Sequence, residues 1–113
     1  MVPKFYVALA FPFVALGLTA AGLAAPLKLS TKCKMPDTVK GRFDHLAVDV
    51  DGNRLFLAAE TAHEVLVFDL RTGEYLRAIP DNQIPSAIFV REDLNRIFVS
   101  DGGVGEVFVY DVE

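Results

Sequence analysis

The second half of the chain alternates between short apolar segments and polar turns. The apolar segments are rich in valine, leucine, isoleucine and phenylalanine, and glycine or asparagine lies between most of them. Segments of this length, bounded by turn-forming residues, are typical of β-strands and are too short for amphipathic helices. The pattern predicts strands at residues 44–50, 54–59, 64–70, 74–79, 85–91, 96–100 and 106–111.

Two of these segments are apolar at consecutive positions instead of alternate ones. They are Leu55–Leu57 and Val65–Phe68. A strand with one solvent-exposed face alternates between apolar and polar residues. A continuous run of apolar residues therefore indicates a strand that is covered on both faces. We therefore expect sheets that are stacked on one another.

Tight turns are predicted at Asp51–Gly52 and at Thr72–Gly73. We expect glycine at both turns to adopt a positive φ, which costs other residues free energy. Turns this short join antiparallel neighbours, so the first four segments are predicted to form a four-stranded meander.

A shift of 42 positions aligns the chain with itself. Residues 53–57 then fall on residues 95–99, and residues 64–69 fall on residues 106–111, with no gap between the two blocks. The chain therefore holds about two copies of one unit. The second copy stops where the first makes its last turn and fourth strand, so we expect it to be incomplete.

These segments resemble the YVTN-type β-propeller repeat family. The matching stretches are Arg54–Ala58, Val65–Asp69 and Thr72–Gly73, and Phe43–Asp49 is similar to the opening of exported propellers in this family. The resemblance implies an all-β fold of about two four-stranded antiparallel propeller-like blades over residues 43–113. The first blade would span about 43–84 and the incomplete second about 85–113. Such propellers serve many roles, so the resemblance says little about function.

A propeller closes a ring of about 4 to 8 blades, and this chain encodes fewer than two. Two blades alone leave their outer apolar faces exposed to solvent and their strand edges unpaired. This predicts self-association through open blade edges. Either several chains complete one ring, or the chain is a fragment of a longer propeller. We favour the fragment, because a self-assembling chain should end at a blade boundary.

Residues 1–24 have the composition of a secretory signal peptide. Lys4 supplies the positive charge, an uncharged run begins at Phe5, and the small residues Gly22 and Ala24 favour cleavage after Ala24. We expect a helical signal segment and a periplasmic or secreted protein. The alternative is an uncleaved membrane anchor over residues 5–27, which is long enough to cross a bilayer.

Residues 25–42 are expected to form a linker. Downstream of the leader the chain carries fifteen acidic and ten basic residues, which argues against nucleic acid as a partner. The linker lysines are interpreted as a solvated stretch, with an anionic membrane surface as the alternative partner. Cys33 is the only cysteine, so it is expected to be a free thiol in a flexible segment, or else to form a disulfide with another chain or with sequence not present here. The lysines of the linker are Lys28, Lys32, Lys34 and Lys40.

No catalytic motif, cofactor motif or metal-ligand pattern is present, so no catalytic residue, cofactor or metal is predicted. The glycine-rich segment 101–105 has too few carboxylates for a calcium loop and is interpreted as a turn. His63 is expected at the surface of a turn.

Asp44, His45 and Asp49 are the candidate ligand residues. In a propeller the first strand of a blade borders the central channel, where ligands often bind and where a neutral imidazole could coordinate a metal or accept a proton. The 42-residue shift places Ser86 and Ala87 opposite Asp44 and His45, so the group is not part of the repeated scaffold. A purely structural histidine is the alternative.

The sequence thus predicts an exported module that binds a small molecule or a protein. The alternative is a piece of a propeller enzyme, lactonase-like or quinoprotein-like, whose remaining active-site residues lie on blades not present in this chain.

Overall fold

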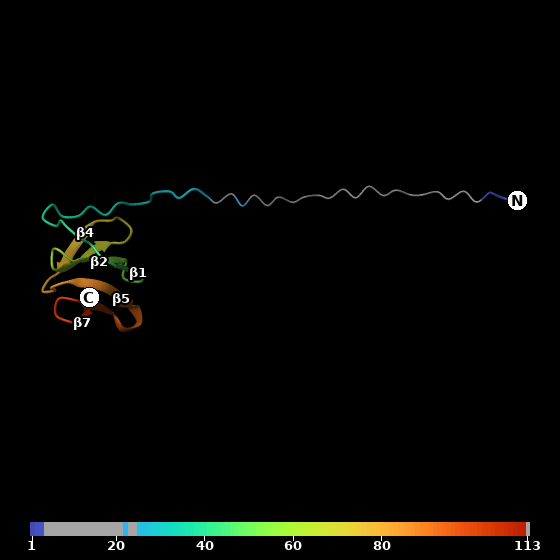
Figure 1. The fold of residues 1–113 in the computed structure, drawn as a ribbon. Coiled ribbons are helices and arrows are strands. Elements are labelled where there is room, and N and C mark those ends of the chain that lie inside the picture. Colours follow the sequence, from blue (N-terminus) through green and yellow to red (C-terminus); the bar gives the residue numbers. More distant parts are fainter. Residues whose placement is uncertain (4–21, 23–24, 113) are drawn as a thin grey trace.

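The fold is all-β, as predicted. The structure, a computed structural model, describes residues 1–3, 22 and 25–112. Each strand predicted from the sequence is present, with bounds within two residues of the expected ones. The strands are β1 (Leu46–Asp49), β2 (Arg54–Ala59), β3 (Glu64–Asp69), β4 (Tyr75–Ile79), β5 (Pro85–Arg91), β6 (Arg96–Asp101) and β7 (Glu106–Asp111), and a short 3-10 helix, η1 (Glu92–Leu94), joins β5 to β6 (Figure 1).

The strands form two antiparallel sheets. Sheet A has the order β1-β2-β3-β4 and sheet B the order β5-β6-β7, so every strand pairs with its neighbour in the sequence. Both sheets are therefore meanders, and the second is one strand shorter than the first. This arrangement of four strands followed by three confirms the prediction from the sequence.

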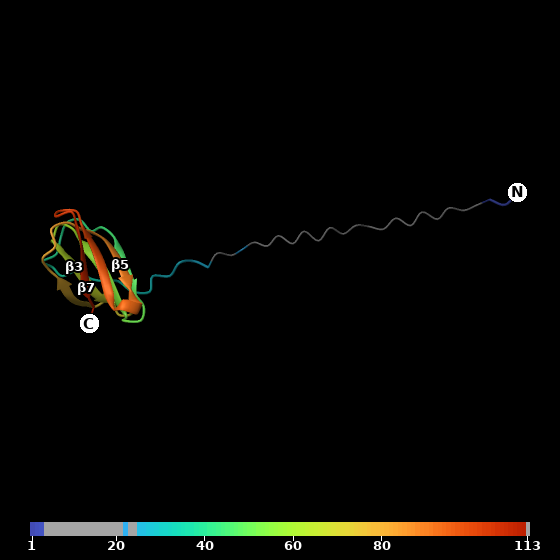
Figure 2. The same cartoon turned by 90° about the horizontal axis from the view of Figure 1, so that it is seen from below.

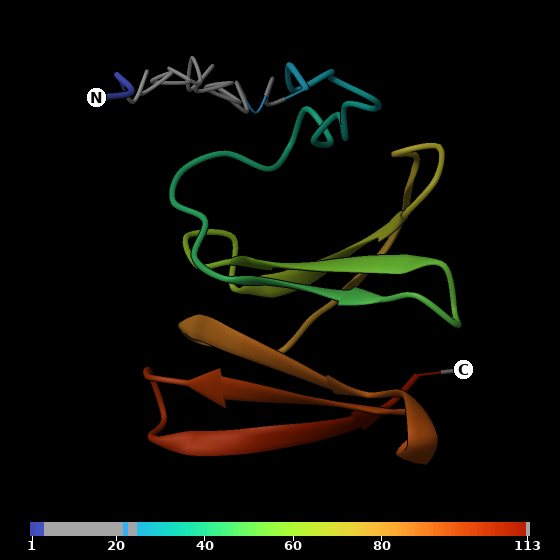
Figure 3. The same cartoon turned by 90° about the vertical axis from the view of Figure 1, so that its right-hand side faces the viewer.

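The two sheets lie face to face. Figure 3 shows sheet A, in green and yellow, above sheet B, in orange and red, and Figure 2 shows the same two layers from below. The core between them is formed by side chains that are almost completely buried, each of which stabilises the fold by about 1.5–3 kcal/mol. They include Phe56, Val65 and Val67 of sheet A and Ile97 and Val99 of sheet B.

A second apolar cluster covers the outer face of sheet A. Leu57, Leu66 and Phe68 point to this side, and Val39 packs on them together with the partly buried Cys33 and Met35. Strands β2 and β3 are thus covered on both faces, which explains their continuous apolar runs. Residues 31–42, which we call the strap, lie inside the segment expected as a linker but pack on the sheet.

Hydrogen bonds hold the strap at both ends of the sheet. The Thr31 hydroxyl donates to the carbonyl oxygen of Arg71 (3.2 Å), and the backbone N–H of Arg42 donates to Oγ1 of Thr61 (2.9 Å). A Cβ on Gly73 would lie 2.6 Å from the carbonyl oxygen of Lys32. The strap therefore runs from the β3–β4 turn to the β2–β3 turn.

The two turn predictions differ in their outcome. Gly73 has a φ of 75°, as expected, but at the first turn the positive φ belongs to Asn53 (54°) and not to Gly52. Gly52 serves another purpose, because a Cβ there would clash with the Asp49 carboxylate and the Arg54 guanidinium. Asparagine tolerates the left-handed conformation, so the residue after the glycine makes the turn.

The backbone repeats with the sequence. Asn53 and Asn95, which the 42-residue shift aligns, have φ of 54° and 51°. His63 and Gly105 form a second aligned pair, with φ of 60° and 72°. The two sheets therefore use the same turn geometry at equivalent places.

Asp101, at the end of β6, fixes the connection between the two sheets. It is 2% exposed and accepts hydrogen bonds from the backbone N–H groups of Gln83 (2.6 Å), Ile84 (2.9 Å) and Gly103 (2.9 Å). Burial acts to raise the pKa of Asp101, but the hydrogen bonds from Ile84, Gln83 and Gly103 outweigh it and hold the pKa below its ordinary value. The carboxylate is charged at neutral pH and stabilises the connection.

The signal helix predicted for residues 1–24 falls mainly on residues outside the described ones. So does the predicted cleavage point after Ala24. Within the part of the chain that the structure describes, no helix is long and apolar enough to cross a bilayer.

Candidate functional site

The three candidate ligand residues do not lie together. Asp44 and His45 form a pair at the start of β1, with 2.6 Å between the Asp44 Oδ1 and His45 Nδ1 atoms, and the imidazole is largely exposed. Asp49 lies at the opposite end of β1 and is buried. The structure therefore brings together two of the three residues.

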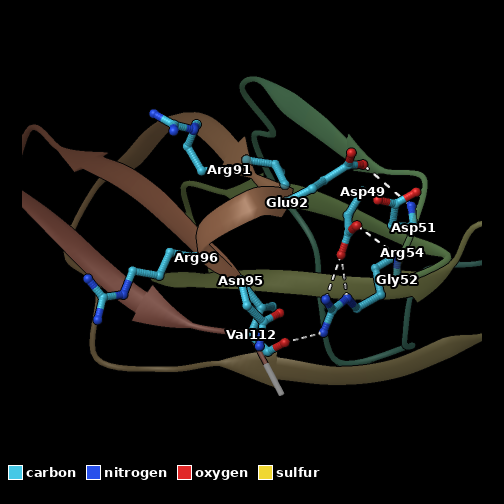
Figure 4. Close-up of a pocket in the computed structure, with 10 residues that line it drawn as sticks. Asp49, Asp51, Gly52, Arg54, Arg91, Glu92, Asn95, Arg96 and Val112 are labelled. Atoms are coloured by element: carbon cyan, nitrogen blue, oxygen red, sulfur yellow. Dashed lines mark hydrogen bonds and ion pairs between the residues drawn. The ribbon is translucent and has the colours of Figure 1, made fainter.

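Asp49 is engaged in the scaffold. Its Oδ2 accepts hydrogen bonds from Nε (2.8 Å) and Nη2 (2.6 Å) of Arg54, and its Oδ1 accepts one from the backbone N–H of Gly52 (2.8 Å). The third nitrogen of Arg54, Nη1, donates to the carbonyl oxygen of Val112 (2.6 Å), as Figure 4 shows. This network joins the β1–β2 turn to the chain that follows β7.

A cleft of about 120 Å³ lies between the sheets at this end. Glu92 of η1 bridges the cleft to the turn after β1, since its Oε1 accepts a hydrogen bond from the backbone N–H of Val50 (2.7 Å). Arg91 and Arg96 also line the cleft, but their side chains point away from Arg54 (Figure 4).

Each arginine of the cleft is held by a carboxylate. Arg54 binds Asp49, Arg96 binds Asp111 (2.9 Å), and the hydrogen bond from Arg91 to Asp93 raises the pKa of the guanidinium. The cleft is therefore a polar seam that fastens the two sheets together, and its cations are already neutralised.

His63 also serves the connection between the sheets. Its Nδ1 donates to the carbonyl oxygen of Gln83, and its own carbonyl oxygen accepts from the backbone N–H of Asn82 (3.2 Å). Among the residues that the structure describes, no three histidine, cysteine, aspartate or glutamate side chains are placed to hold a metal ion.

The outer face of sheet B carries exposed apolar side chains that these contacts do not explain. Phe89 pairs with Phe98, Phe98 with Val109, and Ser100 with Val107, so their side chains share one face. Phe89 and Val107 are each 60% exposed and Val109 is 50% exposed. We call Phe89, Phe98, Val107 and Val109 the open face.

The repeat aligns the open face with the inner face of sheet A. The 42-residue shift places Phe98, Val107 and Val109 on Phe56, Val65 and Val67. In sheet A those three side chains are at most 1% exposed, because sheet B packs on them. The open face is therefore the repeat equivalent of the inner face of sheet A, and no other sheet of the described residues covers it.

The sequence predicted apolar outer faces on both sheets but not the strap. Cys33 and Met35, at alternate positions, face sheet A, whereas Lys32 and Lys34 are exposed. This short alternation before Val39 was the available signal, and the lysines obscured it.

No protein-family model matches the chain, and a search of curated proteins gives no match. Function is therefore inferred from the repeat, the fold and the open face.

Proposed function

We propose that the chain is an exported β-propeller-type interaction module that binds protein through the open face of sheet B. Two stacked meanders with a 42-residue repeat support the propeller-type architecture. The composition of residues 1–24 supports export to the periplasm or beyond the cell. Intact mass of the purified protein tests export, with a start at Ala25 in favour of it and a start at Met1 against it.

One observation carries the proposal. Phe98, Val107 and Val109 have the same residue character and the same place in the repeat as three fully buried side chains, yet Val107 and Val109 are exposed and Phe98 is partly exposed. A contiguous apolar surface of this kind marks a contact site in soluble proteins. The partner that fits it is another β-sheet with an apolar face.

The free edge of sheet B adds to this surface. In the described residues β7 pairs only with β6, whereas the equivalent strand β3 pairs with both β2 and β4. An unpaired edge presents backbone donors and acceptors to an incoming strand. A partner can thus cover the open face with a sheet and extend sheet B with a separate strand.

The test is a double substitution on the open face, Val107→Lys with Val109→Lys. The unchanged protein, expressed as the complete chain, should bind an apolar fluorescent dye at high dilution. The double variant should lose most of the dye fluorescence, because two ammonium groups cannot be buried beneath the dye. Both residues are exposed, so the variant should keep the circular dichroism spectrum of the original protein.

The matched control is Leu76→Lys, which changes an exposed leucine on β4 of sheet A. Dye binding by this variant should stay close to that of the unchanged protein. Equal dye binding by the Val107→Lys, Val109→Lys variant and the unchanged protein would refute the proposal.

A further inference from the structure

The outer face of sheet A is only partly covered by the strap. Leu46 and Val48 pair with Leu57 and Leu55 across the sheet, so the four side chains share this face. Leu57 is nearly buried beneath the strap, whereas Leu46 is 58% exposed and Val48 is 40% exposed. The strap covers the middle of the face and leaves the β1 side open.

This outer face is the repeat equivalent of a surface that already binds a sheet. The 42-residue shift places Leu46 and Val48 on Ile88 and Val90, which pack into the core between the sheets. It places Leu55 and Leu57 on Ile97 and Val99, which are completely buried there. We call Leu46, Val48, Leu55 and Leu57 the head face.

The head face and the open face are thus equivalent to the two surfaces that pack together inside one chain. The inner surface of sheet A corresponds to the open face, and the inner surface of sheet B corresponds to the head face. Apolar residues meet apolar residues in the centre of that contact, and the polar seam of Asp49, Arg54 and Glu92 lies at one end of it. A second copy of the chain offers the complement that the open face lacks.

We infer that two copies of this chain associate head to tail, with the open face of one copy on the head face of the other. The strap then acts as an internal cap, because it occupies part of the head face and must move aside. This inference rests on the proposed function, since it requires the open face to bind protein. Contacts of this kind join two different surfaces, so they can continue into a ring or a filament.

Few polar contacts hold the ends of the strap. Thr31 donates one hydrogen bond to Arg71, and Arg42 and Thr61 exchange two (2.9 and 3.4 Å). Arg42 also forms an ion pair with Glu60 (3.2 Å), whose side chain is 20% exposed. Each of these contributes little free energy at a surface. A sheet that brought leucine, isoleucine and valine side chains to the head face would bury more apolar surface than the strap does.

A complementation experiment tests the inference. One variant carries Val107→Lys with Val109→Lys, which removes the open face, and the other carries Leu46→Lys with Val48→Lys, which removes the head face. All four side chains are exposed, so both variants should fold. Each variant alone should self-associate at least about a hundredfold more weakly than the unchanged protein in sedimentation experiments.

Mixing the two variants gives the decisive result. Each retains the surface that the other has lost, so the mixture should form a heterodimer that does not grow further. Leu76→Lys is the control, and it should associate as the unchanged protein does. If the mixture stays monomeric while the unchanged protein associates, the head-to-tail contact is wrong.

The same data separate this inference from the proposed function. One outcome is that the open-face variant loses self-association and the head-face variant keeps it. That outcome would leave the proposed function standing and would overturn the head-to-tail contact between two copies. Retained dye binding and retained association in the open-face variant would overturn both.

The cap is tested by weakening the ends of the strap. Thr31→Ala with Thr61→Ala removes the two end hydrogen bonds made by threonine hydroxyls, keeps the backbone bond from Thr61 to Arg42, and should tighten self-association about fivefold. Thr38→Ala, an exposed threonine in the same segment, should leave it unchanged. Weaker association in the Thr31→Ala, Thr61→Ala variant would show that the strap supports the contact and would overturn its role as a cap.

Discussion

Asp101 illustrates how a single carboxylate can hold two sheets in register. It lies beneath the connection that leads from sheet A to sheet B and binds three backbone N–H groups. The carboxylate itself is buried, so these hydrogen bonds take the place of the water that it loses on folding. Its ionised form is therefore part of the fold.

Asp101→Asn should destabilise the protein by about 2 kcal/mol at neutral pH, since a neutral amide accepts these hydrogen bonds less strongly. The folded pKa of Asp101 is lowered, so its contribution is present above the ordinary aspartate pKa of about 3.9 and is lost as the pH falls through the folded value. Urea unfolding at pH 7 and below pH 3 measures this difference. A stability gap of equal size at both pH values would contradict the assignment.

Asp49 holds the guanidinium of Arg54 in place at the end of β1. Asp49→Ala would leave the partly buried guanidinium of Arg54 without its carboxylate, which should cost about 3 kcal/mol of unfolding free energy. Asp51→Ala, two residues away at an exposed position, should change stability by less than about 0.5 kcal/mol. Urea unfolding measures both, and similar effects of the two substitutions would argue against the network.

Residue types predicted some of these roles and not others. Gly73 was recognisable because its turn needs a positive φ. The candidate group of Asp44, His45 and Asp49 was proposed because the three lie close in sequence on one predicted strand. A strand carries its first and last residues to opposite ends, and no sequence signal showed that Arg54 would bind Asp49.

At the scale of elements, the strap is the least expected feature. Every strand was predictable, because each is short, apolar and bounded by turn residues. The strap has no strand pairing or helical period, and it is held by side chains that meet only after sheet A has formed. Its place on the sheet therefore depends on tertiary contacts that a local pattern does not reveal.

The packing of the strap can be tested by limited proteolysis. Trypsin should cut after Lys28, which precedes the strap, faster than after Lys34 or Lys40 inside it, because cleavage requires local release from the sheet. Val39→Asp places a charge in the second apolar cluster, on the outer face of sheet A. It should bring the cleavage rates at Lys34 and Lys40 close to the rate at Lys28. Cleavage at Lys34 as fast as at Lys28 in the unchanged protein would show that the strap does not pack.

At the scale of the whole molecule, the two sheets form a stack with unequal ends. One end, the outer face of sheet A, is partly covered by the strap, and the other, the open face of sheet B, is bare. The sequence predicted that both ends would be apolar, since the repeat gives each sheet two apolar faces. Which end is covered depends on the path of residues 31–42.

The central claim is that equivalent positions of the repeat form one buried and one available sheet surface. Hydroxyl-radical footprinting with residue resolution, over a series of protein concentrations, measures this directly. We predict that Phe56, Val65 and Val67 stay protected throughout, whereas Phe98, Val107 and Val109 are oxidised in dilute protein and become protected as concentration rises. Equal oxidation of the two sets in dilute protein would contradict the claim.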